Sequence, residues 1–322
     1  MTKVDLITGF LGAGKTTFLM HYARWLMDRG LRLAILVYDH GAVNVDMPLL
    51  QALQGEQCEL EMLAGACDPD CHKRRFRTKL ISLGMRGFDR ILIEPSGVFD
   101  MDEYFDTLNE SPLDRWFEPG SVIAVVDAKL DETMSPEEDY FLASQALGAG
   151  CILLSRIQLA TPEEAESSLR HLERAVRAIS LSGDGESGIR ERVLAKDWEK
   201  LSDEDYIRLT GCGSGRIDFV KLIAGGGSSF QSLSFLDLQL GRQLMEEKTR
   251  MLFADRGFGK VLRVKGFLAE AGKWYEMNAT PKELKIEAVP QNRGAVTVIG
   301  MDLNEDAISI LLTGRAPEHH IL

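Results

Sequence analysis

The sequence has no long apolar run and no excess of positive charge. No stretch of the 322 residues reaches the roughly 18 uninterrupted apolar residues that a membrane span needs, and Met1-Thr2-Lys3 leads into a predicted strand rather than into an apolar signal segment. The net charge is −12, from 49 acidic and 37 basic residues, and it repels nucleic acid and anionic lipid. We therefore expect a cytoplasmic protein that binds neither nucleic acid nor membrane.

Cysteine is also scarce. Five cysteines in a chain of this length do not suggest a disulfide framework, and grouped cysteines in a reducing compartment more often bind metal or carry redox chemistry. Cys58, Cys67 and Cys71 are grouped, and His72 follows directly. Three thiolates and an imidazole suit tetrahedral Zn²⁺ or another thiophilic transition metal. The alternatives are a redox-active thiol pair and cysteines that only pack in the core.

A phosphate-binding loop begins at Gly9. The spacing between Gly9 and Gly14-Lys15-Thr16 is that of the Walker A motif, and the loop lies between a predicted strand and a predicted helix. Glycines permit positive φ, so that successive backbone N–H groups can surround a phosphate. Lys15 supplies a charge for the outer phosphates, and Thr16 supplies a hydroxyl for Mg²⁺. The predicted phosphate contacts are Gly9, Gly12, Ala13, Gly14, Lys15, Thr16 and Thr17.

Predicted strands and helices alternate in the first half of the chain. A continuous apolar run at 33–37 is typical of a strand buried on both faces of a parallel sheet, and further strands are predicted at 90–93, 121–126 and 151–154. Helical patterns follow several of these runs, which implies an α/β fold with a mainly parallel sheet flanked by helices. Short strands with two helices, near 241–253 and 305–312, then indicate a small C-terminal α+β domain. We expect a P-loop NTPase domain over 1–185, an irregular connecting segment over 186–229 and the C-terminal domain over 230–322.

The strand at 90–93 leads into Glu94-Pro95-Ser96-Gly97. The carboxyl ends of parallel strands meet at one edge of a sheet, so this segment should lie beside the phosphate loop. Glu94 could contact Mg²⁺ or its water, and the N–H of Gly97 could sense the γ-phosphate. A carboxylate at the end of an apolar strand is costly without such a partner. The alternative is an acid that caps a helix.

Together these features resemble the CobW-type GTP-binding proteins, relatives of the UreG and HypB nickel-metallocentre maturation GTPases. The resemblance also draws on Val125-Val126-Asp127-Ala128, on Gln145 and on residues 259–268, and it covers most of the chain. It implies a Mg²⁺-dependent switch that binds and slowly hydrolyses nucleotide while it delivers a metal or assists assembly of a client metallocofactor enzyme. A homodimer is compatible with it.

The resemblance also assigns roles at the nucleotide. Asp39 and Asp46 fall in the family's first switch segment, where Asp39 would reach Mg²⁺ through water and Asp46 would bind metal or orient the attacking water. Solvated loop acids are the alternative for both. Lys15, Glu94 and Asp46 are thus the predicted catalytic residues, and Thr16, Asp39 and Glu94 are the predicted Mg²⁺ ligands.

The sequence departs from the family in two motifs. The family's Cys-x-Cys-Cys motif is replaced by Gly65-Ala66-Cys67-Asp68-Pro69-Asp70-Cys71-His72. The family's NKxD motif, whose Asp recognises guanine, is replaced by Ser155-Arg156-Ile157-Gln158. The amide of Gln158 cannot imitate a bidentate carboxylate, whereas Arg156 could stack on a purine face. The nucleotide is therefore GTP or ATP.

Two other functions compete with a hydrolysing switch. One is a nucleotide-gated adaptor that hydrolyses little and assists a client, such as a corrinoid or other cofactor enzyme. The other is a P-loop kinase for a small molecule, which needs an arginine-rich lid that the sequence does not clearly offer.

Overall fold

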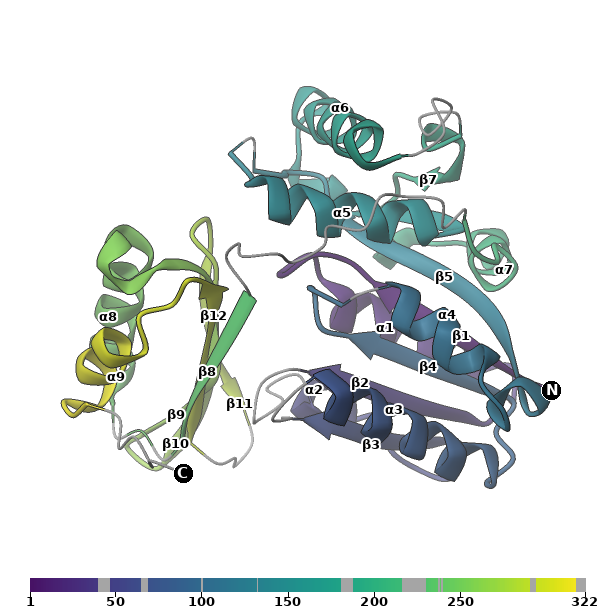
Figure 1. The fold of residues 1–322 in the computed structure, drawn as a ribbon, viewed down its shortest axis with the longest axis horizontal. Coiled ribbons are helices and arrows are strands. Elements are labelled where there is room, and N and C mark those ends of the chain that lie inside the picture. Colours follow the sequence, from purple (N-terminus) through teal and green to yellow (C-terminus); the bar gives the residue numbers. More distant parts are fainter. Residues whose placement is uncertain are drawn as a thin grey trace. The chain divides into compact units, whose positions relative to one another are not determined.

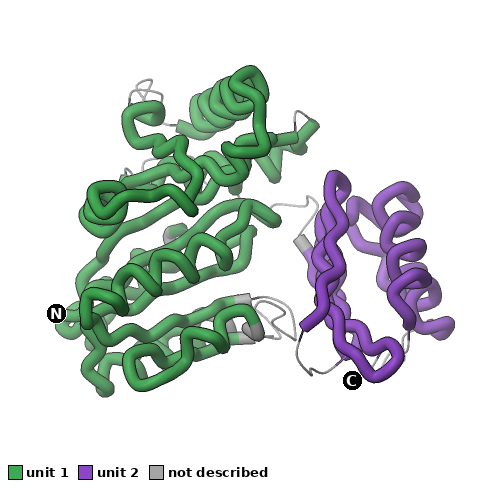
Figure 2. The backbone as a smooth tube through the Cα atoms, turned by 180° about the vertical axis from the view of Figure 1, so that it is seen from behind, with its two compact units in different colours: residues 1–39, 46–223 green, residues 40–45, 224–322 purple. Residues whose placement is uncertain are grey.

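The structure is a computed structural model with two compact units (Figure 2). The first unit contains the described residues up to Gly215, and the second contains those from Phe230 onward. The structure describes residues 1–39, 47–64, 69–99, 101–131, 133–180, 188–215, 230–236, 238, 240–289 and 294–316.

The first unit is built on a seven-stranded sheet with the order β3-β2-β4-β1-β5-β6-β7 (Figure 1). Its strand pairs are all parallel. The strands are β1 (Thr2–Thr8), β2 (Leu33–Asp39), β3 (Cys58–Ala64), β4 (Arg90–Pro95), β5 (Phe117–Asp127), β6 (Cys151–Ser155) and β7 (Val193–Leu194). The predicted parallel α/β sheet is thus confirmed. Alternate residues of its apolar strands belong to two separate cores, because side chains along a strand point to opposite faces.

Helices cover both faces of this sheet. They are α1 (Lys15–Met27), α2 (Met47–Gln51), α3 (Pro69–Gly84), α4 (Met101–Asn109), α5 (Pro136–Gly148), α6 (Pro162–Ile179) and α7 (Asp203–Thr210). Helices α5 and α6 each begin at a capping box, in which Ser135 and Thr161 exchange hydrogen bonds with a glutamate three residues later. Short 3₁₀ helices are η1 (Leu113–Arg115), η2 (Ile157–Leu159), η3 (Arg190–Arg192), η4 (Trp198–Lys200) and η5 (Arg256–Phe258).

A buried polar network lies toward the amino end of β1 and β4. Asp5 in β1 is fully buried and accepts hydrogen bonds from Arg90 Nη1 (2.6 Å) and the Tyr22 hydroxyl (2.8 Å). It also accepts one from the backbone N–H of Ser121 (2.8 Å). Burial and the neighbouring Asp5 carboxylate raise the pKa of Tyr22 well above its ordinary value, so its hydroxyl stays a donor. We call these four residues the amino-end network.

The structure differs from the expected irregular segment over residues 188–215. This stretch supplies β7 to the edge of the sheet, and its helix α7 contributes Tyr206 and Leu209 to the core on one face of that sheet. The strand has two residues and the helix has eight, so neither is long enough to show a periodic pattern in the sequence.

The second unit is a five-stranded antiparallel sheet with the order β11-β10-β9-β12-β8. Its elements are β8 (Phe230–Leu236), α8 (Arg242–Ala254), β9 (Lys260–Glu270), β10 (Lys273–Ala279), β11 (Leu284–Val289), β12 (Ala295–Met301) and α9 (Glu305–Thr313). Both helices pack on one core with the sheet, which confirms the predicted α+β architecture. Among the described residues of the chain, no helix has both the length and the apolar character needed to cross a membrane.

Candidate nucleotide site

The loop between β1 and α1 has a conformation that requires glycine. Gly9, Gly12 and Gly14 have φ values of 148°, 78° and 95°. A Cβ atom added to Gly9 would collide with the carbonyl oxygen of Val125 in β5. The three glycines therefore allow the loop to turn tightly against the sheet at the carboxyl ends of β1 and β5.

Lys15 lies at the start of α1 and is only 6% exposed. Its Nζ atom donates hydrogen bonds to the carbonyl oxygens of Gly9 (2.9 Å) and Phe10 (3.4 Å). The charged end of the side chain thus lies over its own loop. An ammonium held at this position supplies positive charge where the loop would receive phosphate oxygens.

Thr16 and Glu94 meet across the sheet edge. The Thr16 hydroxyl donates to Glu94 Oε1 at 2.5 Å, and both side chains are buried. Glu94 does not cap α4, the next helix along the chain, because that helix begins only at Met101. A hydroxyl and a carboxylate are the oxygen ligands that Mg²⁺ prefers, so this pair fits the predicted ion.

Gly97 packs directly on the phosphate loop. A Cβ atom added to Gly97 would lie 2.6 Å from the backbone nitrogen of Leu11. The carbonyl oxygen of Gly97 accepts a hydrogen bond from Nε2 of the buried Gln145 in α5 (2.9 Å). The segment after β4 is thereby linked to both the loop and α5. The sequence singled out Gln145 only through the family resemblance and did not predict this contact.

Arg156 reaches the loop from the end of β6. It has a left-handed backbone conformation (φ 55°), and its guanidinium contacts Asp127 Oδ2 (2.5 Å) and the carbonyl oxygen of Gly12 (3.3 Å). Asp127 Oδ1 also accepts from the backbone N–H of Lys129 (2.8 Å). Arg156 therefore lies beside the loop, as a nucleotide-site residue should. Its guanidinium is directed at the loop and at Asp127, and its stacking on a base stays a prediction.

Trp198 is a neighbour of the loop that sequence reasoning missed. A Cβ atom added to Gly14 would lie 2.9 Å from Cη2 of Trp198. The indole also packs near Phe18 of α1, with ring centroids 6.5 Å apart. Trp198 follows β7 in the stretch that was predicted to be irregular, and no motif marks it.

Several predicted residues cannot be placed from the structure. Asp46 and Cys67 lie outside the described residues, and so do the side chains of Asp39 and His72. The backbone of Asp39 ends β2 at the same sheet edge as the loop. Among the described residues, no group of three or more His, Cys, Asp or Glu side chains is placed to hold a metal ion.

Cys58 does not belong with Cys71, which corrects the predicted cluster. Cys58 begins β3, whereas Cys71 lies in the first turn of α3, which follows the other end of that strand. A seven-residue strand is about 20 Å long, so the two residues lie near opposite ends of β3. Cys58 is also 1% exposed, and burial raises the pKa of its thiol to about 11. A neutral thiol in the core is a poor metal ligand.

Comparisons with known proteins agree with this geometry. The model of the CobW/HypB/UreG nucleotide-binding domain matches residues 3–181. The zinc chaperone YeiR of Escherichia coli (strain K12) is 30% identical over 173 residues, which cover 53% of this chain and 51% of YeiR. The zinc chaperone YjiA of the same organism is 32% identical over 172 residues, which cover 50% of this chain and 51% of YjiA. The chain thus spans about half the length of the curated relatives it matches.

One solved structure is similar over a longer stretch. The crystal structure of the Zn(II)-bound YjiA GTPase from E. coli is 22% identical, covers 98% of this chain and 99% of its own, and superposes with a TM-score of 0.35. That score is too low to support an argument about this chain. The family model, in contrast, spans more than half of the 322 residues and includes the phosphate loop, Glu94 and Arg156. The chain belongs to the CobW/HypB/UreG family.

Proposed function

We propose that this chain is a Mg²⁺-dependent nucleotide switch that hydrolyses GTP or ATP and directs delivery of a transition metal to a client metalloenzyme or cofactor protein. The assembly of Lys15, Thr16 and Glu94 at the carboxyl ends of β1 and β4 carries the nucleotide part of this proposal. Similarity to two zinc chaperones over half their length supports the metal part, with Zn²⁺ as the first candidate cargo.

The phosphate loop would hold the nucleotide through backbone N–H groups and through the Lys15 ammonium. Thr16 and Glu94 would hold Mg²⁺, with Asp39 reaching it through water. Because the Thr16 hydroxyl gives its hydrogen to Glu94, the lone pairs of its oxygen stay available as ligands. Mg²⁺, when bound, neutralises phosphate charge. The proposed phosphate contacts are those of Gly9, Gly12, Ala13, Gly14, Lys15, Thr16 and Thr17.

Hydrolysis would proceed by in-line attack of water on the γ-phosphoryl group. Lys15 and the loop amides are placed to stabilise the charge that develops on the phosphate oxygens. We assign Asp46 to orient the water. Gly97 would sense the γ-phosphate through its N–H, and its hydrogen bond with Gln145 would carry any movement of that segment to α5.

The nucleotide part is tested by calorimetric titration of non-hydrolysable GTP and ATP analogues with Mg²⁺. We expect Lys15→Ala to weaken binding about 10- to 100-fold, since a hydrogen bond to a charged group contributes about 1.5–3 kcal/mol. Lys129→Ala is the matched control, because this lysine lies at the same sheet edge but pairs with Glu164 on the surface. Absence of binding by the wild-type protein, or equal loss in both variants, would reject the site.

The base preference comes from the same titrations. Without a carboxylate that accepts two hydrogen bonds from guanine, the affinities for GTP and ATP should differ by less than about 10-fold. That hydrogen-bonded pairing provides most of the discrimination between the two bases. A preference above about 1,000-fold for either analogue would show that another group reads the base.

The metal part is tested by elemental analysis of the purified protein. We expect Cys67→Ala to lose a stoichiometric metal that Cys151→Ala keeps, because Cys151 is buried in the core at the start of β6. Identical metal content in both variants would overturn the assignment. Single-turnover hydrolysis that does not respond to Zn²⁺ would favour the adaptor over the switch.

A further inference from the structure

Trp198 lies beside the phosphate loop and has no assigned role. It belongs to η4, which follows β7, and β7 pairs in parallel with β6, so this segment lies at the same sheet edge as the loop. Its ring atoms Cη2, Cζ3 and Cζ2 would lie 2.9, 3.7 and 3.8 Å from a Cβ atom added to Gly14. The family model ends at residue 181, before Trp198, and therefore says nothing about it.

The indole of Trp198 has no aromatic ring stacked on it within the described part of the chain. Its ring contact there is with Phe18, where the centroids are 6.5 Å apart and the planes are inclined by 36°. Trp25 differs, because it stacks on Tyr206 with centroids 5.1 Å apart and planes 18° apart. Trp198 is also half-buried rather than buried, so part of its surface is exposed next to the loop.

The nucleoside part of a bound nucleotide has a definite direction from the loop. The proposed function assigns Mg²⁺ to Glu94 and the γ-phosphate to Gly97, at the end of β4. β4 and β5 flank β1 on opposite sides. The outer phosphates therefore lie on the β4 side, and the ribose and base extend toward the ends of β5, β6 and β7. Trp198 lies on that second side.

Arg156 and Asp127 show what else this side offers to a base. Arg156 comes from the end of β6 and contacts the carbonyl oxygen of Gly12 (3.3 Å). Asp127 Oδ2 accepts a hydrogen bond from Arg156 (2.5 Å), and its Oδ1 accepts one from the N–H of Lys129 (2.8 Å). Both oxygens of this carboxylate thus have partners within the protein. An indole, in contrast, offers a surface that suits any flat base.

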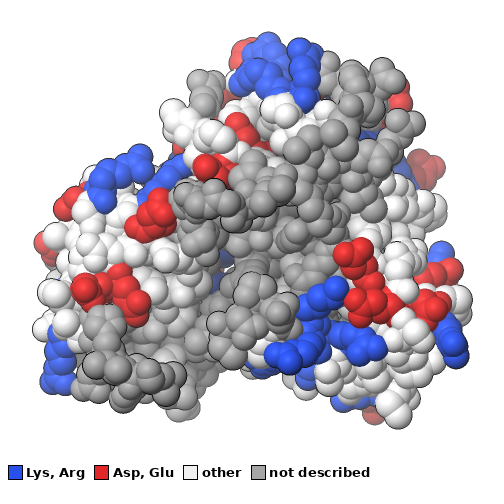
Figure 3. Space-filling view, viewed as in Figure 1, with Lys and Arg blue, Asp and Glu red and all other residues white. Residues whose placement is uncertain are grey.

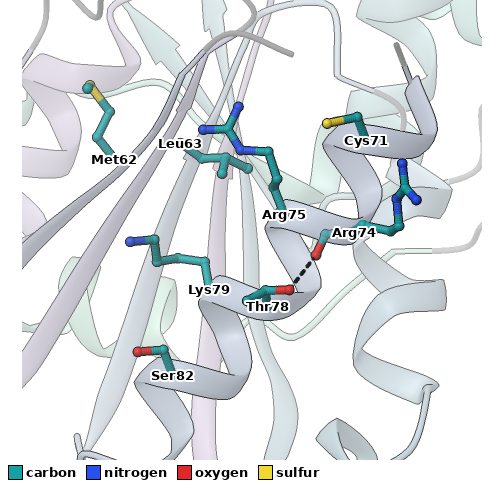
Figure 4. A pocket seen from close by; sticks show the side chains of 8 residues that line it. All are labelled: Met62, Leu63, Cys71, Arg74, Arg75, Thr78, Lys79 and Ser82. Atoms are coloured by element: carbon teal, nitrogen blue, oxygen red, sulfur yellow. Dashed lines mark hydrogen bonds between the residues drawn. The ribbon is translucent and has the colours of Figure 1, made fainter. Parts of the chain in front are cut away.

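The opposite edge of the sheet is a separate surface. A groove between β3 and α3 is lined by Met62, Arg74 and Lys79, and also by Cys71, one of the predicted metal ligands (Figure 4). Lys and Arg side chains gather over α3 (Figure 3). β3 and β7 are the two edges of the described sheet, so this groove is far from Trp198. It is therefore not a candidate for the base.

We propose that Trp198 is a base-stacking residue that makes the site select purine nucleotides without distinguishing guanine from adenine. The inference rests on the proposed function and adds to it the class of base and the residue that contacts it. Stacking recognises the face of a ring, whereas guanine and adenine differ at their edges. A site that relies on the indole therefore accepts both purines.

The test compares Trp198→Leu with Trp198→Phe in the full chain by calorimetry with Mg²⁺. Leucine keeps an apolar side chain beside Phe18 but has no ring, whereas phenylalanine keeps a smaller ring. We expect Trp198→Leu to weaken binding of non-hydrolysable GTP and ATP analogues about 10-fold or more, and equally for the two, as is typical when a stacking ring is removed. Trp198→Phe should stay within about threefold of the wild type.

Inorganic tripolyphosphate separates stacking from support of the loop. It carries phosphates but no base, so it reports on the phosphate loop alone. We expect Trp198→Leu to bind it within about twofold of the wild type. Equal weakening of tripolyphosphate and the nucleotide analogues would show that Trp198 only supports the loop at Gly14, and would overturn the proposal. An unchanged affinity for the analogues would overturn it as well.

Trp25→Leu is the matched control. It removes an indole that packs between α1 and α7, at a position about 15 Å further along α1 than Lys15. We expect it to change the affinity for either analogue by less than about twofold, because no ligand reaches that position. Equal losses in Trp25→Leu and Trp198→Leu would assign the effect to helix packing and contradict stacking.

The wild-type protein separates this inference from the proposed nucleotide site. Binding of neither tripolyphosphate nor nucleotide would reject the site and the inference together. Binding of tripolyphosphate as tightly as the analogues would keep the phosphate loop and reject the base contact. UTP and CTP analogues should bind about 3- to 10-fold more weakly than the purine analogues, since a single ring stacks over less area. Equal affinity for purines and pyrimidines would contradict the proposal.

Discussion

The two ends of β1 and β4 both bury charged side chains, but they do so with different partners. Toward the amino end, Asp5 is held by Arg90, Tyr22 and the N–H of Ser121, which are 85, 17 and 116 residues away in sequence. At the carboxyl end, Lys15 is held by backbone carbonyls six and five residues away. The first arrangement joins distant segments and so supports folding. The hydrogen bonds from Lys15 to Gly9 and Phe10 lie within its own loop, so they can be exchanged for those of a ligand.

The largest expected effect is on stability at the amino end. Asp5→Ala removes the shared acceptor of a buried network, so we expect the free energy of unfolding to fall by about 3–5 kcal/mol in urea denaturation. Lys15→Ala, at the other end, should cost about 1 kcal/mol or less, because backbone carbonyls can be rehydrated there. Similar losses in the two variants would remove the contrast between the ends.

Thiols at the amino ends of the strands should react more slowly than the thiol that follows the carboxyl end of β3. Cys58 and Cys151 begin β3 and β6, and burial raises their pKa values to about 11 and about 12. At pH 8 we expect iodoacetamide to modify them at least about 100-fold more slowly than the half-buried Cys71, as followed by mass spectrometry.

The same pKa values give a pH dependence with a definite sign. For a thiol whose folded pKa is raised, the stabilisation is complete below its ordinary pKa of 9.0 and is lost as the pH rises through about 11. Cys58→Val should flatten this part of the stability curve. Rapid alkylation of Cys58 in the folded protein would contradict the assigned burial.

Glu94→Gln should affect magnesium rather than folding. The amide keeps the shape of the side chain but loses the charge, so we expect nucleotide affinity in the presence of Mg²⁺ to fall about 10-fold. Without Mg²⁺ the variant and the wild type should agree within about twofold by calorimetry. Glu118→Gln, the same change in the amino-terminal part of β5, is the control. A loss that is equal with and without Mg²⁺ would argue against a metal role for Glu94.

The smallest effect is expected for the ion pair of Arg156 and Asp127. Their side chains are 30% and 17% exposed, so solvent weakens the attraction. A double-mutant cycle of Arg156→Met and Asp127→Asn should give a coupling free energy of about 0.5–1 kcal/mol in urea denaturation. A coupling as large as the loss in Asp5→Ala would place a rigid network at the carboxyl end as well.

The sequence predicted what depends on neighbours along the chain. The loop glycines, Lys15 and Thr16 lie within a few residues, and their spacing alone indicates phosphate chemistry. Glu94 was predictable for a related reason, because a carboxylate at the end of an apolar strand needs a partner and the ends of parallel strands converge.

What the sequence did not predict depends on distant segments. Nothing near Asp5 in sequence announces Arg90 or Ser121, and nothing near Trp198 announces Gly14. The predicted grouping of Cys58 with Cys71 was wrong for the opposite reason. Cys58 is close to Cys71 along the chain, but β3 lies between them, so the two residues are near opposite ends of that strand.

The position of Trp198 makes it an intrinsic fluorescent probe of the phosphate loop. The indole touches the loop at Gly14, so a ligand that changes the electric field or the solvent access there should change the emission of this ring. The chain contains four tryptophans, and replacing Trp25, Trp116 and Trp274 by phenylalanine leaves Trp198 as the single emitter. Occupancy of the loop could then be followed in real time, with unlabelled nucleotide and without any added dye.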